Sequence, residues 1–419
     1  MLFSSKNISF RLTLMAVLAI SLACSDRERT NPLDPGNSDR NRGNLGFNAL
    51  AGNNQVLLEW NRLDFDDLAG VRVQRIESGT DDTVTVTDSS LSLSTTRYVD
   101  NTSKNGNTYS YHLAFDVEGS DEKPVTMSDT VTPGPVFTYV ELIDYGEVVL
   151  FTPDFRDEVF SLDAGFFDVV DIEVGSTVWV LDANGAIHRF NRNGELIGSG
   201  DLLNASAMTF NLLDSSSWVA LTGETGLVYH FHSNGDLINS KATNLEVTSI
   251  ALEREGLGDL WIGSSEPSIA KLSRSSNSST QYSHSDFVNP ELVVTSRHIS
   301  GVWIGDHGAN RVMHFTSAGM RWSTDGFTEV NDLVINDDGS LCWVADAPAD
   351  KVYILNGRSG EVISSMSGFG SPFYLAYNRA NHTVLVSGST GLLSTISESG
   401  ELLSSVLNPD RTGKISLAY

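Results

Sequence analysis

Apolar segments recur at a nearly constant spacing along the C-terminal two-thirds of the chain. Six of them are centred on a large apolar residue and follow one another at intervals of about forty residues. Their centres are Trp179, Trp218, Trp261, Trp303, Trp343 and Leu385. Each apolar segment is short and bounded by turn residues, which favours buried β-strands over helices. The period therefore predicts a repeated all-β unit.

Each repeat contains further strand signals around its apolar centre. After Trp303, for example, residues 312–315 form a second apolar stretch, Gly319 marks a turn, and a third stretch follows. Glycine supplies the positive φ that tight hairpins require. A fourth strand signal precedes each centre, as at residues 332–335 before Trp343. Four strands in about forty residues are typical of one blade of a β-propeller.

The two ends of this region suggest how the propeller closes. Residues 136–144, 147–153 and 158–163 give three strands with no strand before them, and residues 414–419 give one strand with no blade of its own. Pairing that last strand with the first three completes a blade and leaves no exposed edge. We therefore expect a seven-bladed β-propeller over residues 135–419, with a six-bladed one as the alternative.

The repeat resembles the NHL-type and streptogramin-lyase-type propeller repeats. The resemblance rests on Trp-Val/Ile-x-Asp followed by a turn and a basic residue before an apolar strand. Residues 303–312 (WIGDHGANRV) are the best copy. The resemblance implies a propeller fold. It does not imply one activity, because propellers of this kind include binding scaffolds, sensors, lactonases and lyases.

A second, smaller β-domain is expected over residues 45–134, ending at Pro133-Gly134-Pro135. Apolar and polar residues alternate here, and turn signals recur every ten residues or so, which favours a β-sandwich. The segment resembles a fibronectin type III domain. The residues that carry the resemblance are Trp60, Gly70-Val71-Arg72-Val73, Tyr98-Val99-Asp100, Gly106, Tyr109-Ser110-Tyr111, Asp116 and Gly119. Trp60 and Tyr111 are expected in the core.

The N-terminal residues have the pattern of an export signal. Lys6 and Arg11 precede an apolar stretch that ends at Ala23, directly before Cys24. This stretch is too short to span a bilayer as a helix. Residues 21–24 resemble the bacterial lipobox, which implies a signal peptide over residues 1–23 and a lipid on Cys24; an ordinary signal peptide cut near Ala23 is the alternative. Residues 24–44 are predicted to be a flexible tether.

These features predict an exported protein that is lipid-anchored to the bacterial cell envelope. Ser25 after the cysteine makes the outer membrane the expected location, with the lipid as the only membrane attachment. The net charge is −26, from 53 acidic and 27 basic residues. Such a field repels phosphate backbones, so no nucleic-acid partner is expected. The two cysteines form no disulfide framework, and Cys342 lies in an apolar run where a buried thiol is expected.

The sequence offers few candidates for chemistry. The common hydrolase, metalloprotease and nucleotide-binding motifs are absent from the sequence, so we assign no catalytic residue and no cofactor, and the metal question stays open. His188, His230 and His314 fall in second strands, and the simplest interpretation is a polar, exposed strand face. Candidate ligand contacts on the propeller rim are Asp182, Asp306, His307 and Asp346. Turn capping is the alternative for the three aspartates.

We therefore expect a non-catalytic binding or scaffold module for a protein, peptide or glycan. An exported enzyme of the lactonase or lyase type is the alternative, suggested by the resemblance alone. Because the most regular positions of the repeat are explained by the fold, a specific site is expected in the loops, where the blades differ.

Overall fold

The computed structural model describes residues 47–63, 68–80, 82–117, 119, 125–211, 213–223, 226–253 and 258–418. The signal segment 1–23, the tether 24–44 and Cys24 lie outside them. The described chain is all-β and consists of antiparallel sheets. In this part of the chain no helix is long and apolar enough to cross a membrane. The chain forms two compact units; the second begins at Thr132, beside the predicted linker, and also includes Ala51–Asn54 and Lys104–Gly106.

The N-terminal unit contains two sheets. One has the order β1 (Asn48–Gly52), β2 (Gln55–Glu59) and β5 (Arg97–Asp100). The other has the order β4 (Thr83–Thr85), β3 (Leu68–Glu77), β6 (Tyr109–Val117) and β7 (Val125–Val131). Trp60 and Tyr111 are buried, as predicted. Buried Asp100 links the sheets, because its Oδ2 accepts hydrogen bonds from Arg75 Nη1 at 2.6 Å and Tyr111 Oη at 2.7 Å.

The C-terminal unit contains seven four-stranded antiparallel sheets among the described residues. We number them in chain order and give each from its inner to its outer strand. Sheet 1 has β35 (Thr412–Ala418), β8 (Phe137–Leu142), β9 (Glu147–Phe151) and β10 (Glu158–Leu162); sheet 2 has β11 (Val169–Val174), β12 (Val178–Asp182), β13 (Ala186–Phe190) and β14 (Leu196–Asp201); sheet 3 has β15 (Ala205–Asn211), β16 (Ser216–Leu221), β17 (Leu227–Phe231) and β18 (Leu237–Ala242); sheet 4 has β19 (Val247–Leu252), β20 (Leu260–Ser264), β21 (Ser268–Leu272) and β22 (Ser279–Ser283). Sheet 5 has β23 (Leu292–Val294), β24 (Val302–Asp306), β25 (Arg311–Thr316) and β26 (Gly319–Thr324); sheet 6 has β27 (Asp332–Ile335), β28 (Leu341–Asp346), β29 (Lys351–Asn356) and β30 (Val362–Ser367); sheet 7 has β31 (Pro372–Asn378), β32 (Thr383–Gly388), β33 (Leu392–Ser397) and β34 (Leu402–Leu407).

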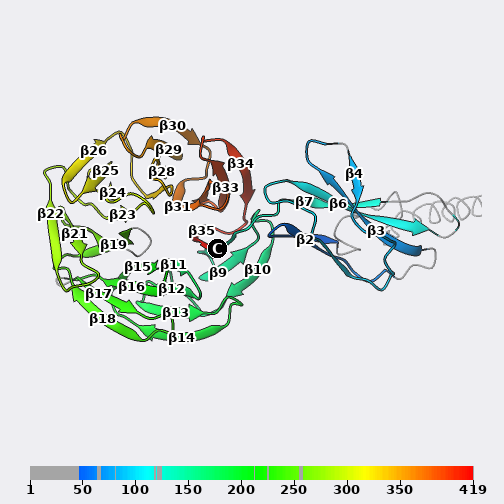
Figure 1. The fold of residues 1–419 in the computed structure, drawn as a ribbon, viewed down its shortest axis with the longest axis horizontal. Helices are drawn as coiled ribbons and strands as arrows, with labels where there is room; N and C mark the ends of the chain where they lie inside the picture. Colours follow the sequence, from blue (N-terminus) through cyan, green and yellow to red (C-terminus); the bar gives the residue numbers. More distant parts are fainter. Residues whose placement is uncertain are drawn as a thin grey trace, which may run out of the picture. The chain divides into compact units, whose positions relative to one another are not determined.

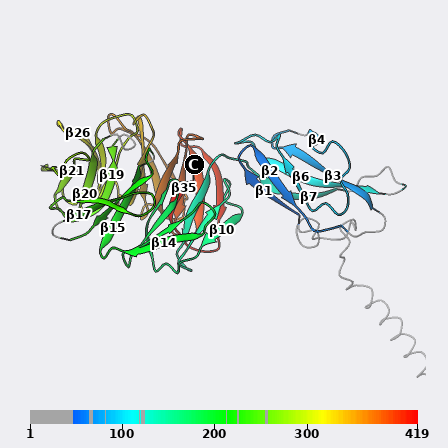
Figure 2. The ribbon, with the colours of Figure 1, turned by 60° about the horizontal axis from the view of Figure 1, so that its bottom comes forward.

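The seven sheets follow one another around a circle (Figure 1). The inner strand of each sheet contacts the inner strand of the next, in the cyclic order β35, β11, β15, β19, β23, β27 and β31. Figure 2 shows this unit from an oblique angle, with its sheets side by side. Each neighbouring pair shares its own cluster of buried apolar side chains. Burial of apolar surface between neighbouring sheets is therefore the main favourable contribution to the folding free energy of this unit.

The two ends of the unit meet in sheet 1. The C-terminal strand β35 pairs antiparallel with β8, with Ile415 opposite Val140 and Leu417 opposite Thr138. This is the pairing that the sequence predicts. Leu417 also packs with Leu385 and Leu393 of sheet 7, so the end of the chain belongs to a core made with strands far away in sequence.

The tryptophans of the repeat lie in the second strand of sheets 2 to 6 and are buried. In sheets 2 to 5, the residue opposite the tryptophan on the third strand covers the indole. In sheet 6 the residue opposite Trp343 is Ile354. Arg189 and Lys271 do so with a cation, 5.4 Å above Trp179 and 5.1 Å above Trp261. The same strand register thus accommodates different residues at one position, and the two cations each add a favourable contact with the indole.

Two histidines occupy this position, and here the sequence interpretation was wrong. His230 stacks on Trp218 with ring centroids 3.8 Å apart, and His314 stacks on Trp303 at 4.2 Å. Both side chains are only 8% exposed rather than part of an exposed strand face. The flat imidazole packs against the indole as an aromatic ring does, and burial lowers the pKa of each histidine to about 4. Half-buried His188 differs, since its Nδ1 lies 3.3 Å from Ser199 Oγ.

Candidate functional site

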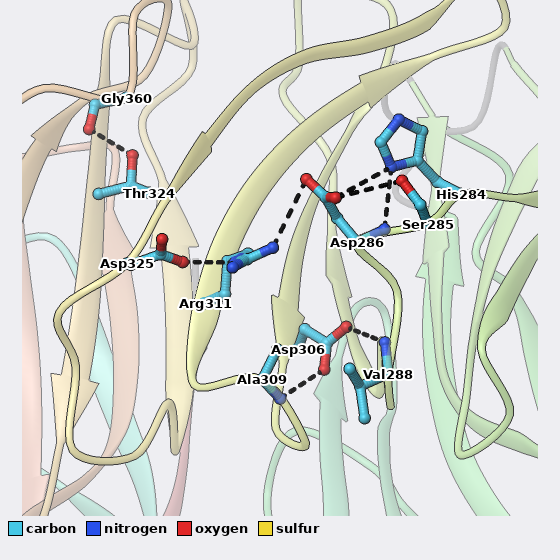
Figure 3. Close-up of polar contacts among 10 residues, drawn as sticks. All are labelled: His284, Ser285, Asp286, Val288, Asp306, Ala309, Arg311, Thr324, Asp325 and Gly360. Atoms are coloured by element: carbon cyan, nitrogen blue, oxygen red, sulfur yellow. Dashed lines mark hydrogen bonds and ion pairs between the residues drawn. The ribbon is translucent and has the colours of Figure 1, made fainter.

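The three aspartates predicted as rim contacts are buried, and backbone amides use their carboxylates. Asp306 accepts from the N–H groups of Val288, Asn289 and Ala309 at 2.8–2.9 Å. Figure 3 shows the bonds from Val288 and Ala309. Asp182 and Asp346 likewise accept from the loop before their sheet and from the turn after their strand, with partners Phe167, Asn184, Thr328 and Ala349. The turn-capping alternative accounts for all three carboxylates.

His307, the fourth predicted contact, lies on the surface. Its side chain is 45% exposed, and Nε2 lies 3.5 Å from Glu329 Oε1. The structure does not gather His307 and the three aspartates into one open site, because the aspartate side chains point into the turns they hold.

Charged side chains that the sequence did not single out organise the neighbouring loops. Arg311 pairs with Asp325 and lies 3.5 Å from Asp286 Oδ2 (Figure 3). The backbone N–H of Asp286 donates to His284 Nδ1 at 3.2 Å. The three side chains in the ion pairs are at least one-quarter exposed, so this cluster is a solvated network that ties two loops to the start of β25. Exposed pairs of this kind contribute little to stability.

The same face, on which the turns after the second strands and the loops between sheets lie, carries large exposed apolar side chains. Tyr145, Phe167 and Leu203 are 66%, 75% and 74% exposed. They belong to turn 143–146, loop 163–168 and loop 202–204, in sheet 1 and at the entries to sheets 2 and 3. We call these three residues the apolar arc.

The segments of the apolar arc pack against one another in sequence. A Cβ on Gly146 would lie 2.2 Å from the carbonyl oxygen of Phe166, and a Cβ on Gly185 would lie 2.4 Å from that of Leu202. Turn 143–146 therefore touches loop 163–168, and the turn after Asp182 touches loop 202–204. The Phe167 N–H bonds to Asp182 Oδ2 at 2.7 Å, which joins the two contacts. The three exposed side chains thus follow one continuous run of loops.

Acidic residues accompany the apolar arc. Asp163 and Asp168 lie in the loop that carries Phe167, and Asp201 ends the strand before Leu203; all three are exposed. Exposed aromatic and aliphatic side chains flanked by charges of one sign are typical of an interaction surface.

A second candidate site lies between the inner strands, where a cavity of about 310 Å³ opens. Its charged lining residues come from strands distant in sequence: Asp171 and Glu173 of β11, Asp332 of β27 and Lys414 of β35. Asp171 Oδ2 accepts from the Met208 N–H at 3.1 Å, and Asp332 Oδ2 accepts from the Leu375 N–H at 2.8 Å. Each aspartate thus links its own inner strand to that of the next sheet.

The cavity raises the pKa of three of its charged groups, for two different reasons. Burial raises the pKa of Asp332 to about 6 and places the pKa of Glu173 well above its ordinary range, with the nearby Asp171 charge adding to the latter. Burial alone would lower the pKa of Lys414, but attraction by Asp171, Asp332, Tyr374 and Glu141 outweighs it and the pKa is raised. Lys414 is therefore charged at neutral pH and balances part of the acidic lining.

Sequence reasoning missed this lining. Its signal is the pattern VVDIEV in β11 and DLVI in β27, where acidic residues stand in otherwise apolar inner strands. Among the described residues, no three His, Cys, Asp or Glu side chains lie close enough to bind a metal ion. Cys342 is the buried thiol that the sequence predicts. Burial raises its pKa to about 12, which makes it unreactive.

Comparison with known proteins identifies the fold alone. The chain matches no family model and no curated protein. A solved structure of a functionally unknown protein from Desulfotomaculum acetoxidans aligns with 68% of this chain and 99% of its own, at 13% identity and a TM-score of 0.57. A protein of unknown function from Bacteroides caccae aligns over the same shares at 11% identity and a TM-score of 0.44, too low to support an argument.

Proposed function

We propose that the C-terminal unit is a seven-bladed β-propeller and the N-terminal unit a fibronectin type III-like domain. The cyclic order of the seven inner strands and the seven shared apolar clusters support the propeller. The division of seven strands into sheets of three and four supports the second assignment.

We propose that the protein is a non-catalytic binding module of the bacterial cell envelope, held there by a lipid on Cys24, in the outer membrane. Its partner is a protein or peptide that docks on the apolar arc. The observation that carries this proposal is the continuous run of loops that exposes Tyr145, Phe167 and Leu203. Tyrosine is one of the residue types that carry most of the binding energy in protein interfaces, and large apolar neighbours exclude water around it.

The charges around the arc indicate the chemistry of the partner. Asp163, Asp168 and Asp201 flank the apolar side chains, and the whole chain carries 53 acidic against 27 basic residues. A segment that presents apolar side chains among lysines or arginines complements this surface, and the opposite charges speed its association. A neutral glycan would gain nothing from the acidic flanks, so a basic protein segment is the favoured partner.

The enzyme alternative has less support. In the described part of the chain, backbone N–H groups occupy the carboxylates of Asp171 and Asp332, and no three potential metal ligands lie together. A lactonase-type mechanism needs such a metal-ligand set, and no feature of this structure favours it.

The proposal is tested by comparing two triple variants of the full-length protein in its own envelope. Tyr145, Phe167 and Leu203 are changed to serine in one. The matched control changes Leu196, Leu237 and Leu402, which are 49–55% exposed on outer strands. After chemical cross-linking and affinity purification, the same partner should be recovered with the wild type and the control and be depleted at least tenfold with the arc variant. Equal recovery with both variants, or no partner with the wild type, would overturn the proposal.

A further inference from the structure

The exposed apolar surface of the arc continues beyond Tyr145, on the side away from Phe167. Here loop 408–411 connects sheet 7 to the C-terminal strand β35 of sheet 1. Leu407, the last residue of β34, stands directly before this loop and is 68% exposed. It lies opposite Leu392, which follows the turn after the second strand of sheet 7. Leu407 is therefore at the same face of the unit as the apolar arc.

Leu407 has no counterpart at the ends of the other six outer strands, all of which the structure describes. Those strands end in Leu162, which is buried, or in Asp201, Ala242, Ser283, Thr324 and Ser367, none of which is a large apolar residue. The repeated fold thus does not require an exposed leucine at this position. An exposed apolar side chain that adjoins others is typical of an interaction surface.

Hydrogen bonds and an ion pair join this loop to the turn that carries Tyr145. Asp144 accepts from the backbone N–H of Arg411 at 3.0 Å and from its Nε at 2.8 Å, and Nη2 of Arg411 lies 2.7 Å from Asp144 Oδ1. The Ile143 N–H donates to the carbonyl oxygen of Arg411 at 2.9 Å. These contacts hold the turn of Tyr145 against the loop that follows Leu407.

We propose that the partner-binding surface continues across the junction of sheets 7 and 1 to Leu407, with the Asp144–Arg411 pair as the contact that positions Tyr145 within it. Since it concerns the same partner, a basic protein segment, this extension rests on the proposed function. It adds a fourth apolar side chain to the surface. It also makes the closed junction a condition for binding.

The charges at the junction suit the same partner. Arg411 is neutralised by its ion pair with Asp144, so this basic side chain does not give the junction a net positive charge. Glu147 is exposed at the start of β9, and Asp410 is half-buried in the loop. The acidic flanks of the apolar arc therefore continue across the junction, and a segment with apolar side chains among lysines or arginines complements the whole surface.

The place of these contacts links partner binding to the closure of the circle. Arg411 directly precedes β35, which pairs with β8. If β35 left sheet 1, Arg411 would separate from Asp144, and Leu407 would no longer be held beside the turn of Tyr145. A partner that contacts both apolar side chains binds the closed form better than the open one, and so stabilises closure by mass action.

Photo-crosslinking tests how far the surface extends. A photoreactive phenylalanine analogue replaces Leu407, Phe167 or Leu402 in three versions of the full-length protein, and intact cells are illuminated. Leu402 begins the same strand that Leu407 ends and is 55% exposed, so it controls for the strand itself. Position 407 should give an adduct of the same mass as position 167, and position 402 should not.

The outcomes separate this proposal from the one it rests on. An adduct at position 167 with none at 407 would overturn the extension and leave the proposed function standing. An adduct of that mass from 402 as well as 407 would also overturn the extension, because the surface would then not follow the face of the arc. No adduct at 167 would contradict the proposed function, and the extension with it.

A charge-neutral double variant tests the ion pair. Asp144→Asn with Arg411→Gln removes the pair and keeps the net charge, so overall attraction of a basic partner is unchanged. The adduct yield at position 167 should fall at least threefold. Asp338→Asn with Arg358→Gln is the matched control, because these exposed side chains lie 4.0 Å apart at the opposite end of sheet 6. This control should give the wild-type yield.

A merely structural role of the pair would appear as a loss of stability. Exposed ion pairs contribute little to stability, so both double variants should melt close to the wild-type temperature, which also shows that they are folded. A lower yield in the junction variant at an unchanged melting temperature assigns the pair a positioning role. A yield that falls equally in both variants, or in neither, would overturn that role.

Discussion

Glu141 accepts a hydrogen bond from the backbone N–H of Lys414 at 3.0 Å, and its other oxygen accepts from the Val169 N–H at 3.0 Å. One carboxylate therefore holds three strands: β8, on which it lies, the C-terminal strand β35, and β11 of the next sheet. The two ends of the C-terminal unit are joined by strand pairing, and Glu141 ties that junction to its neighbour.

Replacing Glu141 should weaken this junction. Glu141→Gln keeps one acceptor but turns an amide N–H toward one of the two backbone donors, so we expect a loss of about 1–3 kcal/mol in unfolding free energy. Urea denaturation at pH 7.5 measures it. Glu147→Gln, on the exposed start of β9, is the control and should change little. An unaltered midpoint for Glu141→Gln would show that the bridge does not contribute.

The stacked histidines should make the protein less stable in mild acid. Their pKa is about 4 in the folded protein and about 6.5 when unfolded. A lowered pKa gives stability that is present above pH 6.5 and lost as the pH falls toward 4. Between pH 7.5 and 5 the loss is roughly 2 kcal/mol for each histidine.

The double variant His230→Phe, His314→Phe should remove this loss. Phenylalanine keeps a flat ring on Trp218 and Trp303, and the buried Nε2 atoms have no hydrogen-bond partner to lose. Chemical denaturation at the two pH values compares the variant with the wild type. If both lose the same free energy between pH 7.5 and 5, the histidines do not carry the acid sensitivity.

Glu173 should act on stability in the opposite sense. Its raised pKa means that the folded state holds a proton that the unfolded state releases, so stability falls as the pH rises from about 4.5 through the folded pKa. Glu173→Gln should therefore melt roughly 2–4 °C higher than the wild type at pH 8. The difference should disappear near pH 4.5, while the parallel contribution of Asp332 remains in both proteins. A variant that melts lower at pH 8 would contradict the assignment.

The lipid anchor gives a prediction outside the described residues. Cells grown with radioactive palmitate should label the wild type, and Cys24→Ala should carry no label and should leave the membrane fraction. Cys342→Ala is the matched control, because this buried thiol offers no site for a lipid. Equal labelling of wild type and Cys24→Ala would refute acylation at Cys24.

The strands of the repeat were predictable from the sequence because their signals are local. Each tryptophan and each glycine turn is recognised within one repeat, and the pairing of β35 with β8 follows from two incomplete ends. The stacking of His314 on Trp303 could not be predicted in this way. To predict that a histidine lies opposite a tryptophan, one must know the register of the two strands. The alternation of polar and apolar residues along each strand does not determine that register.

The two candidate sites depend on contacts between distant parts of the chain. Glu173 and Lys414 line one cavity because the last strand lies beside β11, although the two residues are far apart in sequence. Tyr145, Phe167 and Leu203 form an arc only because loops of successive sheets touch. No periodic pattern marks either set, since periodicity identifies what the repeats share and these residues are where the repeats differ.

The central claim is that a protein partner docks on the apolar arc, and site-specific photo-crosslinking tests it most directly. A photoreactive phenylalanine analogue is placed at Phe167 and, in a second protein, at Leu402 on an outer strand, 55% exposed. Illumination of intact cells should give one discrete adduct from position 167 and none of that mass from position 402. No adduct at 167, or the same adducts from both positions, would contradict the claim.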